Sequence, residues 1–235
     1  MPPVAENLSL VESRIAAACG RAGRARESVE LIAVSKTFPA AAVREVSELG
    51  QRLFGESRLQ EAEPKIAMLP ASLRWHFIGG LQRNKIRKIL PLFEAIHAID
   101  SLKLATYADQ VASELGLFPK IFLQVNVAGE ATKGGFAPEE LREQMEALIS
   151  LPRLEIQGLM TIPPAGPDAE SARPWFAALR ELRDRLAIDS GMGLPQLSMG
   201  MSSDYEVAIE EGASLVRVGS AIFGHRAYRV DGELG

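Results

Sequence analysis

The chain has 235 residues, of which 47% are hydrophobic and 24% are charged, a composition typical of globular proteins and unlike that of disordered segments. A net charge of -4 at pH 7 argues against a general affinity for nucleic acid or anionic membranes. One cysteine, Cys19, excludes an intramolecular disulfide framework. The first residues form neither a signal peptide nor an apolar membrane segment, so we expect a cytoplasmic protein.

Apolar residues predict helices and strands in regular alternation along the first half of the chain. A leading helix is predicted over residues 7–19, where apolar residues recur at helical spacing. The first strand covers the apolar residues 31–34, and a helix follows between Pro39 and Gly50. Further strands are predicted over residues 52–55, 74–78, 93–99 and 120–127, and further helices over residues 57–68, 84–90 and 102–115.

The same alternation continues to the end of the chain. A glycine-rich loop at 129–135 precedes a helix that begins near Pro138. Strands then follow over residues 154–160, 197–199 and 215–218, with helices over residues 169–188 and 204–211.

About eight strands alternating with helices predict parallel βαβ units in an α/β fold. A chain near the typical ~250 residues then favours a single (β/α)8 TIM barrel, here with an extra N-terminal helix. An open, doubly wound sheet is the alternative. No composition shift or repeat divides the chain, so we expect one domain over residues 1–235.

Lys36 follows the first predicted strand, at the edge of its apolar run. In such barrels the active site lies at the C-terminal ends of the strands. Partial desolvation there favours the neutral, nucleophilic amine over the ammonium, as formation of a Schiff base requires. The alternative is a lysine that extends its ammonium from the strand end into water.

Glycine and hydroxyl side chains follow the last two predicted strands. Gly219 and Ser220 come directly after the eighth strand, and Ser202 and Ser203 follow the seventh. Loops at these two places frequently hold a phosphate in barrels, because backbone N–H groups next to glycine can point at the anion. Taken alone, Ser202 or Ser203 would rather suit an N-cap of the next helix, and the two roles are compatible.

Arg217 lies within the eighth predicted strand, where a buried guanidinium requires a partner. That partner is either a carboxylate, such as Asp204 or Glu206, or a ligand atom. The first and eighth strands are neighbours in a closed barrel, so Arg217 and the Gly219–Ser220 pair come close to Lys36. An amine, an arginine and a phosphate cradle side by side suit pyridoxal 5'-phosphate (PLP).

Seven short segments together form a specific combination, which includes Ala-Val-Ser-Lys-Thr at residues 33–37 and Arg-Val-Gly-Ser-Ala-Ile-Phe-Gly at residues 217–224. The others lie at residues 75–79, 81–85, 124–126 (with Lys133 and Gly135), 158–162 and 198–202 (with Asp204 and Glu206). In this combination the chain resembles the pyridoxal phosphate homeostasis proteins, the YggS-like family of PLP-binding barrels. One departure is Ser57, which stands where the family usually has asparagine.

The resemblance implies a fold similar to the barrel domain of alanine racemase. It also implies that Lys36 carries PLP as an internal aldimine. Ser202, Gly219 and Ser220 would hold the phosphate. Arg217 would lie toward the pyridine nitrogen.

Other polar side chains near the ends of the predicted strands are secondary candidates. We expect His76 and Asn126 to bind the cofactor as well. Lys133, in the glycine-rich loop, is either a lid over the barrel mouth or an exposed loop lysine. His97 alternates within an apolar strand and is expected to be a hydrogen-bonded core histidine. Because His76, His97 and His225 lack the spacing of a metal site, we predict no bound metal.

We predict a protein that binds, buffers and delivers PLP through a Schiff base on Lys36, without strong catalytic activity. Its partners would be PLP and the apo-forms of PLP-dependent enzymes, and we expect a monomer. An arginine beside the pyridine nitrogen weakens the cofactor as an electron sink. We expect no second domain and no second base, with Tyr107 in a helix, Tyr205 beside the phosphate loop and Tyr228 in the tail. Alternatives are a PLP-dependent amino-acid racemase and a Schiff-base aldolase that works without cofactor.

Overall fold

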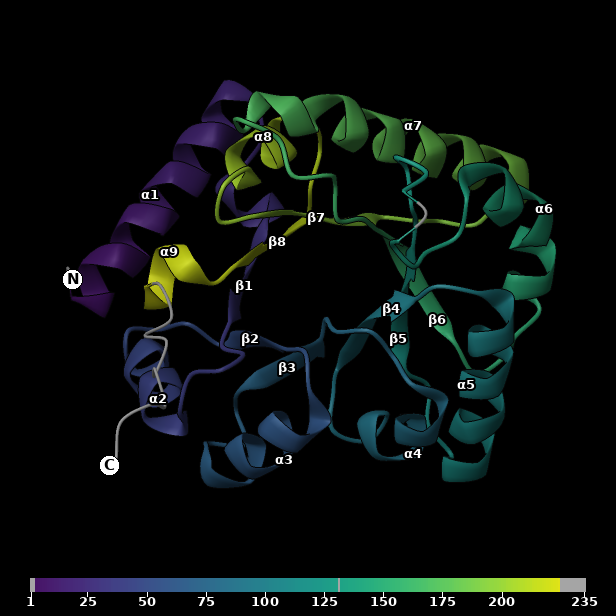
Figure 1. Cartoon of the computed structure of the whole chain (residues 1–235), viewed down its shortest axis with the longest axis horizontal. Coiled ribbons are helices and arrows are strands. Elements are labelled where there is room, and N and C mark those ends of the chain that lie inside the picture. The colour runs from purple at the N-terminus through teal and green to yellow at the C-terminus, as the bar shows by residue number, and fades with distance from the viewer. Residues whose placement is uncertain (1–2, 131, 225–235) are drawn as a thin grey trace, which may run out of the picture.

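Eight parallel strands close into a barrel in the computed structural model, which describes residues 3–130 and 132–224 (Figure 1). Neighbours in the barrel follow the chain order, and β1 pairs with β8, with Ile32 opposite Arg217. The predicted closed barrel is therefore confirmed, and the open sheet is wrong. The strands are β1 Glu30–Val34, β2 Leu53–Glu56, β3 Arg74–Phe77, β4 Ala95–Ile99, β5 Lys120–Gln124, β6 Glu155–Met160, β7 Gln196–Met201 and β8 Leu215–Val218.

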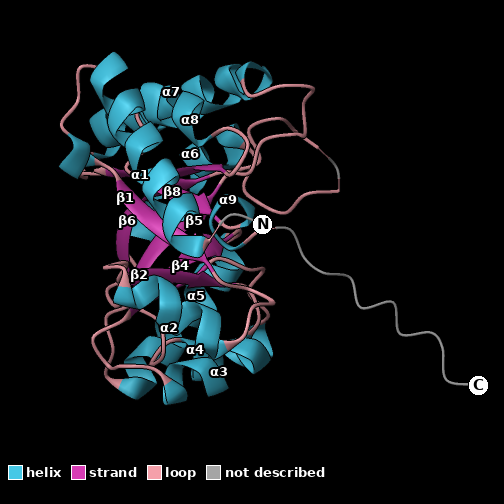
Figure 2. Cartoon of the chain, turned by 90° about the vertical axis from the view of Figure 1, so that its left-hand side faces the viewer, coloured by secondary structure: helices cyan, strands magenta, loops and turns pink. Residues whose placement is uncertain are grey.

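Helices surround the strands, which occupy the centre of the molecule in Figure 2. The predicted N-terminal helix is present and packs against α8 and α9. None of the helices in the described residues is long and apolar enough to span a membrane. The α-helices are α1 Val4–Arg21, α2 Ala40–Glu48, α3 Leu59–Met68, α4 Ile86–Ile89, α5 Leu102–Leu115, α6 Pro138–Ile149, α7 Arg173–Ser190, α8 Tyr205–Glu210 and α9 Ser220–Phe223, with 3₁₀ turns at η1 Arg26–Ser28, η2 Arg83–Lys85 and η3 Glu170–Ala172.

The structure corrects several predicted bounds. The helix predicted over residues 84–90 is the turn η2 followed by the single turn of α4. β5 ends at Gln124 rather than at residue 127, because Phe136 folds the glycine-rich loop back and forms a bridge with Val125. β7 is longer than residues 197–199, since Gly200, with φ of 92°, continues the strand toward the site. The short helix α9 was not predicted, because four residues carry no helical periodicity.

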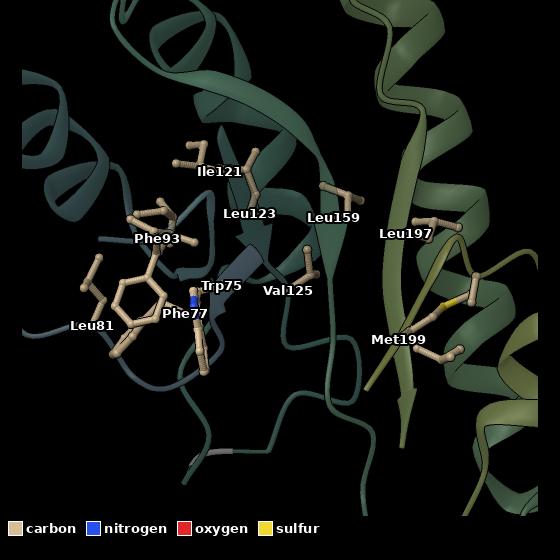
Figure 3. Close-up of a cluster of buried hydrophobic side chains, with 14 of the residues drawn as sticks. Trp75, Phe77, Leu81, Phe93, Ile121, Leu123, Val125, Leu159, Leu197 and Met199 are labelled. Carbon is tan, nitrogen blue, oxygen red and sulfur yellow. The ribbon is translucent and has the colours of Figure 1, made fainter. Parts of the chain in front are cut away.

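Alternate residues of the strands face two apolar cores. On β1, Ile32 and Val34 belong to a small cluster inside the barrel, whereas Leu31 and Ala33 belong to the larger layer between strands and helices. Figure 3 shows part of that outer layer, with side chains such as Trp75 and Phe77 of β3. The residue between these two, His76, therefore faces the barrel interior. Polar side chains inside the barrel thus occupy a space that is otherwise apolar.

Candidate cofactor-binding site

Lys36 lies in the turn that follows β1, and buried hydrogen bonds fix the residue before it. Ser35 Oγ donates to Glu56 Oε1 over 2.7 Å. Lys65 Nζ donates to the same carboxylate oxygen over 2.7 Å and to the Ser35 carbonyl over 2.8 Å. Ser35, Glu56 and Lys65 are all buried, so water competes little for these bonds. The base of the lysine side chain is therefore held in a defined position.

The residues after Lys36 are held as well. Thr37 has φ of 70°, the left-handed region that β-branched residues rarely adopt. Its N–H donates to Glu61 Oε2 over 2.9 Å. The ring of Phe38 stacks on Phe223 of α9, with 4.9 Å between the ring centroids. These contacts tie the turn that carries Lys36 both to α3 and to the end of the barrel beyond β8.

A cavity of about 590 Å³ opens beside Lys36, within the range of small-molecule sites. The turn after β1, Ser57 after β2 and the segments at the ends of β7 and β8 contribute its polar lining. Apolar side chains, among them Val34 and Ile78, also line it. The polar lining includes Lys36, Ser202, Ser203, Arg217, Gly219 and Ser220. Five of the seven residues predicted to bind a cofactor thus lie in one cavity.

Ser202 connects the segments after β7 and β8. Its Oγ accepts hydrogen bonds from the N–H groups of Gly219, over 3.1 Å, and Ala221, over 3.4 Å. An oxygen that accepts twice still has its own hydroxyl proton to donate. The N-cap of α8 is Asp204, so the alternative that Ser202 or Ser203 caps this helix is wrong. The Ser202 hydroxyl is therefore a donor fixed at the cavity, of the kind that a phosphate requires.

Arg217 is only 5% exposed, and its guanidinium is held by two neutral oxygens. Nη1 donates to Ser198 Oγ over 2.6 Å, and Nη2 donates to the Thr161 carbonyl over 2.8 Å. Burial lowers the pKa of Arg217 to about 10, which the charge of Asp204 offsets only in part, so the group stays charged at neutral pH.

The ion pair considered for Arg217 is not formed within the described residues. Glu206 instead pairs with Arg21 over 2.9 Å. Asp204 accepts the Met201 N–H over 2.6 Å. The guanidinium is thus held by neutral oxygens of Ser198 and Thr161 rather than by either of these carboxylates.

His97 is a fully buried, hydrogen-bonded core histidine, as predicted. Its Nδ1 lies 2.8 Å from Ser198 Oγ, and its Nε2 lies 2.9 Å from Nδ1 of His76. His76 is therefore occupied within the barrel, and the structure does not bring it into the cavity lining. The reason is its depth, because Ile78, two residues later on the same face of the chain, lines the cavity instead.

Asn126 does not line the cavity either. Its Nδ2 donates to the carbonyls of Glu130 and Lys133, over 2.9 and 3.2 Å, and its Oδ1 accepts the Glu130 N–H over 3.2 Å. The amide thus braces its own loop. Lys133 is half-buried, bound to the Glu130 carboxylate over 2.5 Å and to the Pro163 carbonyl over 3.1 Å. It ties two loops together and is therefore not the exposed loop lysine.

Comparison with known proteins identifies the family to which the chain belongs. The model of the alanine racemase N-terminal domain matches residues 7–227. The chain is 45% identical to the pyridoxal phosphate homeostasis protein of Aquifex aeolicus, over 95% of this chain and 98% of that protein. It is 48% identical to the protein of the same name from Pseudomonas aeruginosa, over 97% and 98%. The chain belongs to the family of pyridoxal phosphate homeostasis proteins.

Solved structures agree with this family. PipY of Synechococcus elongatus, solved with PLP bound, is 42% identical and covers 94% of this chain and 100% of its own, with a TM-score of 0.84. Alanine racemase of Clostridium difficile is 18% identical, with a TM-score of 0.71, and the match covers 95% of this chain and 58% of the racemase chain. That second likeness shows a shared fold alone.

Some polar residues of the site were missed in the sequence. Ser198, Glu56 and Lys65 had no predicted role, although a polar residue within an apolar strand was a usable signal for the first two. Two residues considered above, His225 and Tyr228, lie outside the described residues. Within the part of the chain that the structure describes, no group of three or more acidic, histidine or cysteine side chains is arranged to hold a metal ion.

Proposed function

We propose that the protein binds PLP in the cavity beside Lys36 and serves PLP homeostasis by binding, buffering and delivering the cofactor. The observation that carries the proposal is that Lys36, Arg217 and the Ser202–Gly219 hydrogen bond border one cavity. When bound, PLP supplies an aldehyde that condenses reversibly with a primary amine. The printed names of the relatives and the PLP-bound structure of PipY support the same assignment.

The residues of the cavity fit each part of this cofactor. Lys36 offers the amine for the aldehyde, and its backbone is held on both sides. Ser202 and Ser220 offer hydroxyl donors for the phosphate beside Gly219, whose N–H holds Ser202 Oγ in place, and Arg217 offers donors for the ring nitrogen. The apolar lining provided by residues such as Val34 and Ile78 suits the flat face of the ring.

The electrostatics favour binding of the cofactor rather than catalysis with it. Arg217 stays protonated at neutral pH, so it donates hydrogen bonds and releases no proton. Such a partner favours an unprotonated ring nitrogen, which is the weaker electron sink. We propose a cytoplasmic, monomeric carrier with a single domain that supplies apo-forms of PLP-dependent enzymes.

The assignment of Lys36 is tested by trapping the bound cofactor. Purified protein mixed with PLP should develop a visible absorbance band, and borohydride reduction should fix one cofactor on Lys36, as read by peptide mass spectrometry. Lys36→Arg keeps the positive charge but should lose the adduct, whereas Lys133→Ala should keep it. An adduct that persists at the same yield after Lys36→Ala would show that another amine holds the cofactor.

Delivery is tested by a transfer assay. Protein loaded with PLP should activate an apo-enzyme faster than the cofactor that it releases into solution does. Equal rates would reduce the role to storage. Deuterium exchange at the α-carbon of amino acids, well above the rate with free PLP, would instead favour the racemase.

A further inference from the structure

A continuous hydrogen-bonded chain crosses the interior of the barrel and ends in the cavity. It runs from His76 on β3 to His97 on β4, then to Ser198 on β7 and Arg217 on β8. The three links measure 2.9, 2.8 and 2.6 Å. All four residues are buried, and His97 and Ser198 have no exposed surface. The chain thus connects residues far apart in the sequence with one side chain of the cavity.

The hydrogen bonds of this chain have one consistent direction. Burial lowers the pKa of His76 to about 4 and that of His97 well below its usual value, so both rings are neutral, with one N–H and one acceptor nitrogen each. Arg217 only donates, so Ser198 Oγ accepts a hydrogen bond from it. The Ser198 hydroxyl in turn donates a hydrogen bond to Nδ1 of His97. His97 then donates from Nε2 to Nδ1 of His76. In the reverse direction the buried Ser198 hydroxyl would have no acceptor among the described residues.

The surroundings of these four hydrogen-bonded residues explain why they act on Arg217. His97 packs against the ring of Phe122, with 4.3 Å between centroids, in an apolar interior that holds polar groups only when they are paired. The charges that act on His76 come from Glu94, Arg74 and Lys120. The charge that acts on Arg217 comes from Asp204, and those that act on His97 come from His76 and Arg217. Hydrogen bonds that all point the same way polarise one another, so the orientation of Ser198 depends on both histidines.

We propose that His97 is a positioning residue for cofactor binding: through Ser198 it fixes the guanidinium of Arg217 at the cavity, and it thereby controls how tightly the cofactor is held. His76 supports this role by accepting from His97. The inference rests on the proposed function, because it concerns the contact between Arg217 and PLP. It adds a layer of residues that do not touch the cavity themselves.

The test compares two substitutions of His97. His97→Phe keeps a ring and loses both hydrogen bonds, whereas His97→Gln keeps an acceptor for Ser198 and a donor for His76. We expect His97→Phe to weaken PLP binding about tenfold, the equivalent of one good hydrogen bond to a charged group, and to move the pH midpoint of the bound cofactor's absorbance. His97→Gln should restore both values to near those of the unmodified protein.

Phe122→Leu is the matched control for packing. It disturbs the same interior without removing a hydrogen bond, so it should lower thermal stability and leave affinity and pH midpoint in place. A folded His97→Phe variant with unchanged affinity and midpoint would overturn the inference, and so would an equal effect of Phe122→Leu. If His97→Phe does not fold, Ser198→Ala, which removes only a hydroxyl, carries the same expectation.

A measurement on cofactor-free protein separates this inference from the proposed function. Nitrogen-15 NMR at pH 7 should show both imidazoles neutral and protonated on Nε2. Protonation of His97 on Nδ1, or a charged ring, would overturn the direction of the chain. Absence of any Lys36 adduct in the unmodified protein would overturn the proposed function, whatever the NMR result.

Discussion

Lys65 Nζ lies 2.7 Å from Glu56 Oε1 in a buried ion pair beside the residue that precedes Lys36. Glu56 has no exposed surface and Lys65 is 6% exposed, so both charges have lost most of their hydration. The second carboxylate oxygen of Glu56 has no hydrogen-bond partner among the described residues. A pair of this kind gains little over an apolar pair, and its effect here is to fix Ser35, which it contacts through two atoms.

Removing one partner of this pair should be strongly destabilising. We expect Lys65→Met to lower the free energy of unfolding by about 3 kcal/mol, because the Glu56 carboxylate is left buried without its cation. Urea denaturation measures the change. Arg87→Met breaks an exposed ion pair with Glu114 and should cost much less than Lys65→Met. Similar losses in the two variants would mean that the Glu56 carboxylate reaches water.

The backbone of Thr37 predicts a stabilising substitution. Thr37→Gly removes the side-chain clash of the left-handed region and should raise the free energy of unfolding by roughly 0.5–1 kcal/mol, net of the greater flexibility of glycine. Thermal and urea denaturation test this. Ala41→Gly, in the first turn of α2, serves as control and should destabilise, since its backbone is helical. A loss of stability in Thr37→Gly would show that the threonine side chain makes contacts that outweigh the strain.

The fold was predictable because its signals are periodic. Parallel strands buried on both faces give apolar runs, and the helices between them give the 3.6-residue spacing, so strand order followed once closure was assumed. Lys36, Arg217 and the Gly219–Ser220 pair were found together because β1 and β8 are neighbours. Only the topology of the barrel was needed to predict that these residues lie together.

The residues that the sequence misplaces share a physical cause. Whether His76 or Ile78 lines the cavity depends on depth along the barrel axis, which shear and register decide and no local pattern records. The Asn126 side chain is drawn into its own loop, which the bridge between Val125 and Phe136 folds back, a contact that no local pattern predicts. The direct partners of Arg217 on β8 are Ser198 on β7 and Thr161 directly after β6, contacts that arise only in three dimensions.

The hydroxyl of Ser202 should matter more for PLP than that of Ser203. Ser202→Ala leaves the N–H groups of Gly219 and Ala221 without their acceptor and removes a donor for the phosphate, so we expect the affinity for PLP to fall roughly tenfold. Ser203→Ala is the matched control, since Ser203 lines the same cavity and shares no hydrogen bond with α9 in the described structure. Equilibrium titration of both variants with PLP measures the two affinities. Equal affinities would show that Ser202 does not bind the phosphate.

Acid should destabilise the protein through its buried histidines. Burial lowers the pKa of His76 from 6.5 to about 4, so between these values the unfolded state binds more protons than the folded state. The stability from this group is therefore complete above pH 6.5 and is lost as the pH falls toward 4. The pKa shift of His76 corresponds to a loss of about 3 kcal/mol in the free energy of unfolding over this whole pH range.

The pH range in which His76 affects stability differs from that of the nearby Glu94 carboxylate. A hydrogen bond from Arg74 is the main reason why the pKa of Glu94 falls to about 2, so its contribution is lost mainly below pH 4.5. Urea denaturation at pH 7 and pH 5 should therefore report chiefly on histidine. His76→Gln should start less stable at pH 7 and lose less stability on acidification than the unmodified protein. Parallel losses in both proteins would show that His76 is already protonated in the fold, or that another group dominates this pH range.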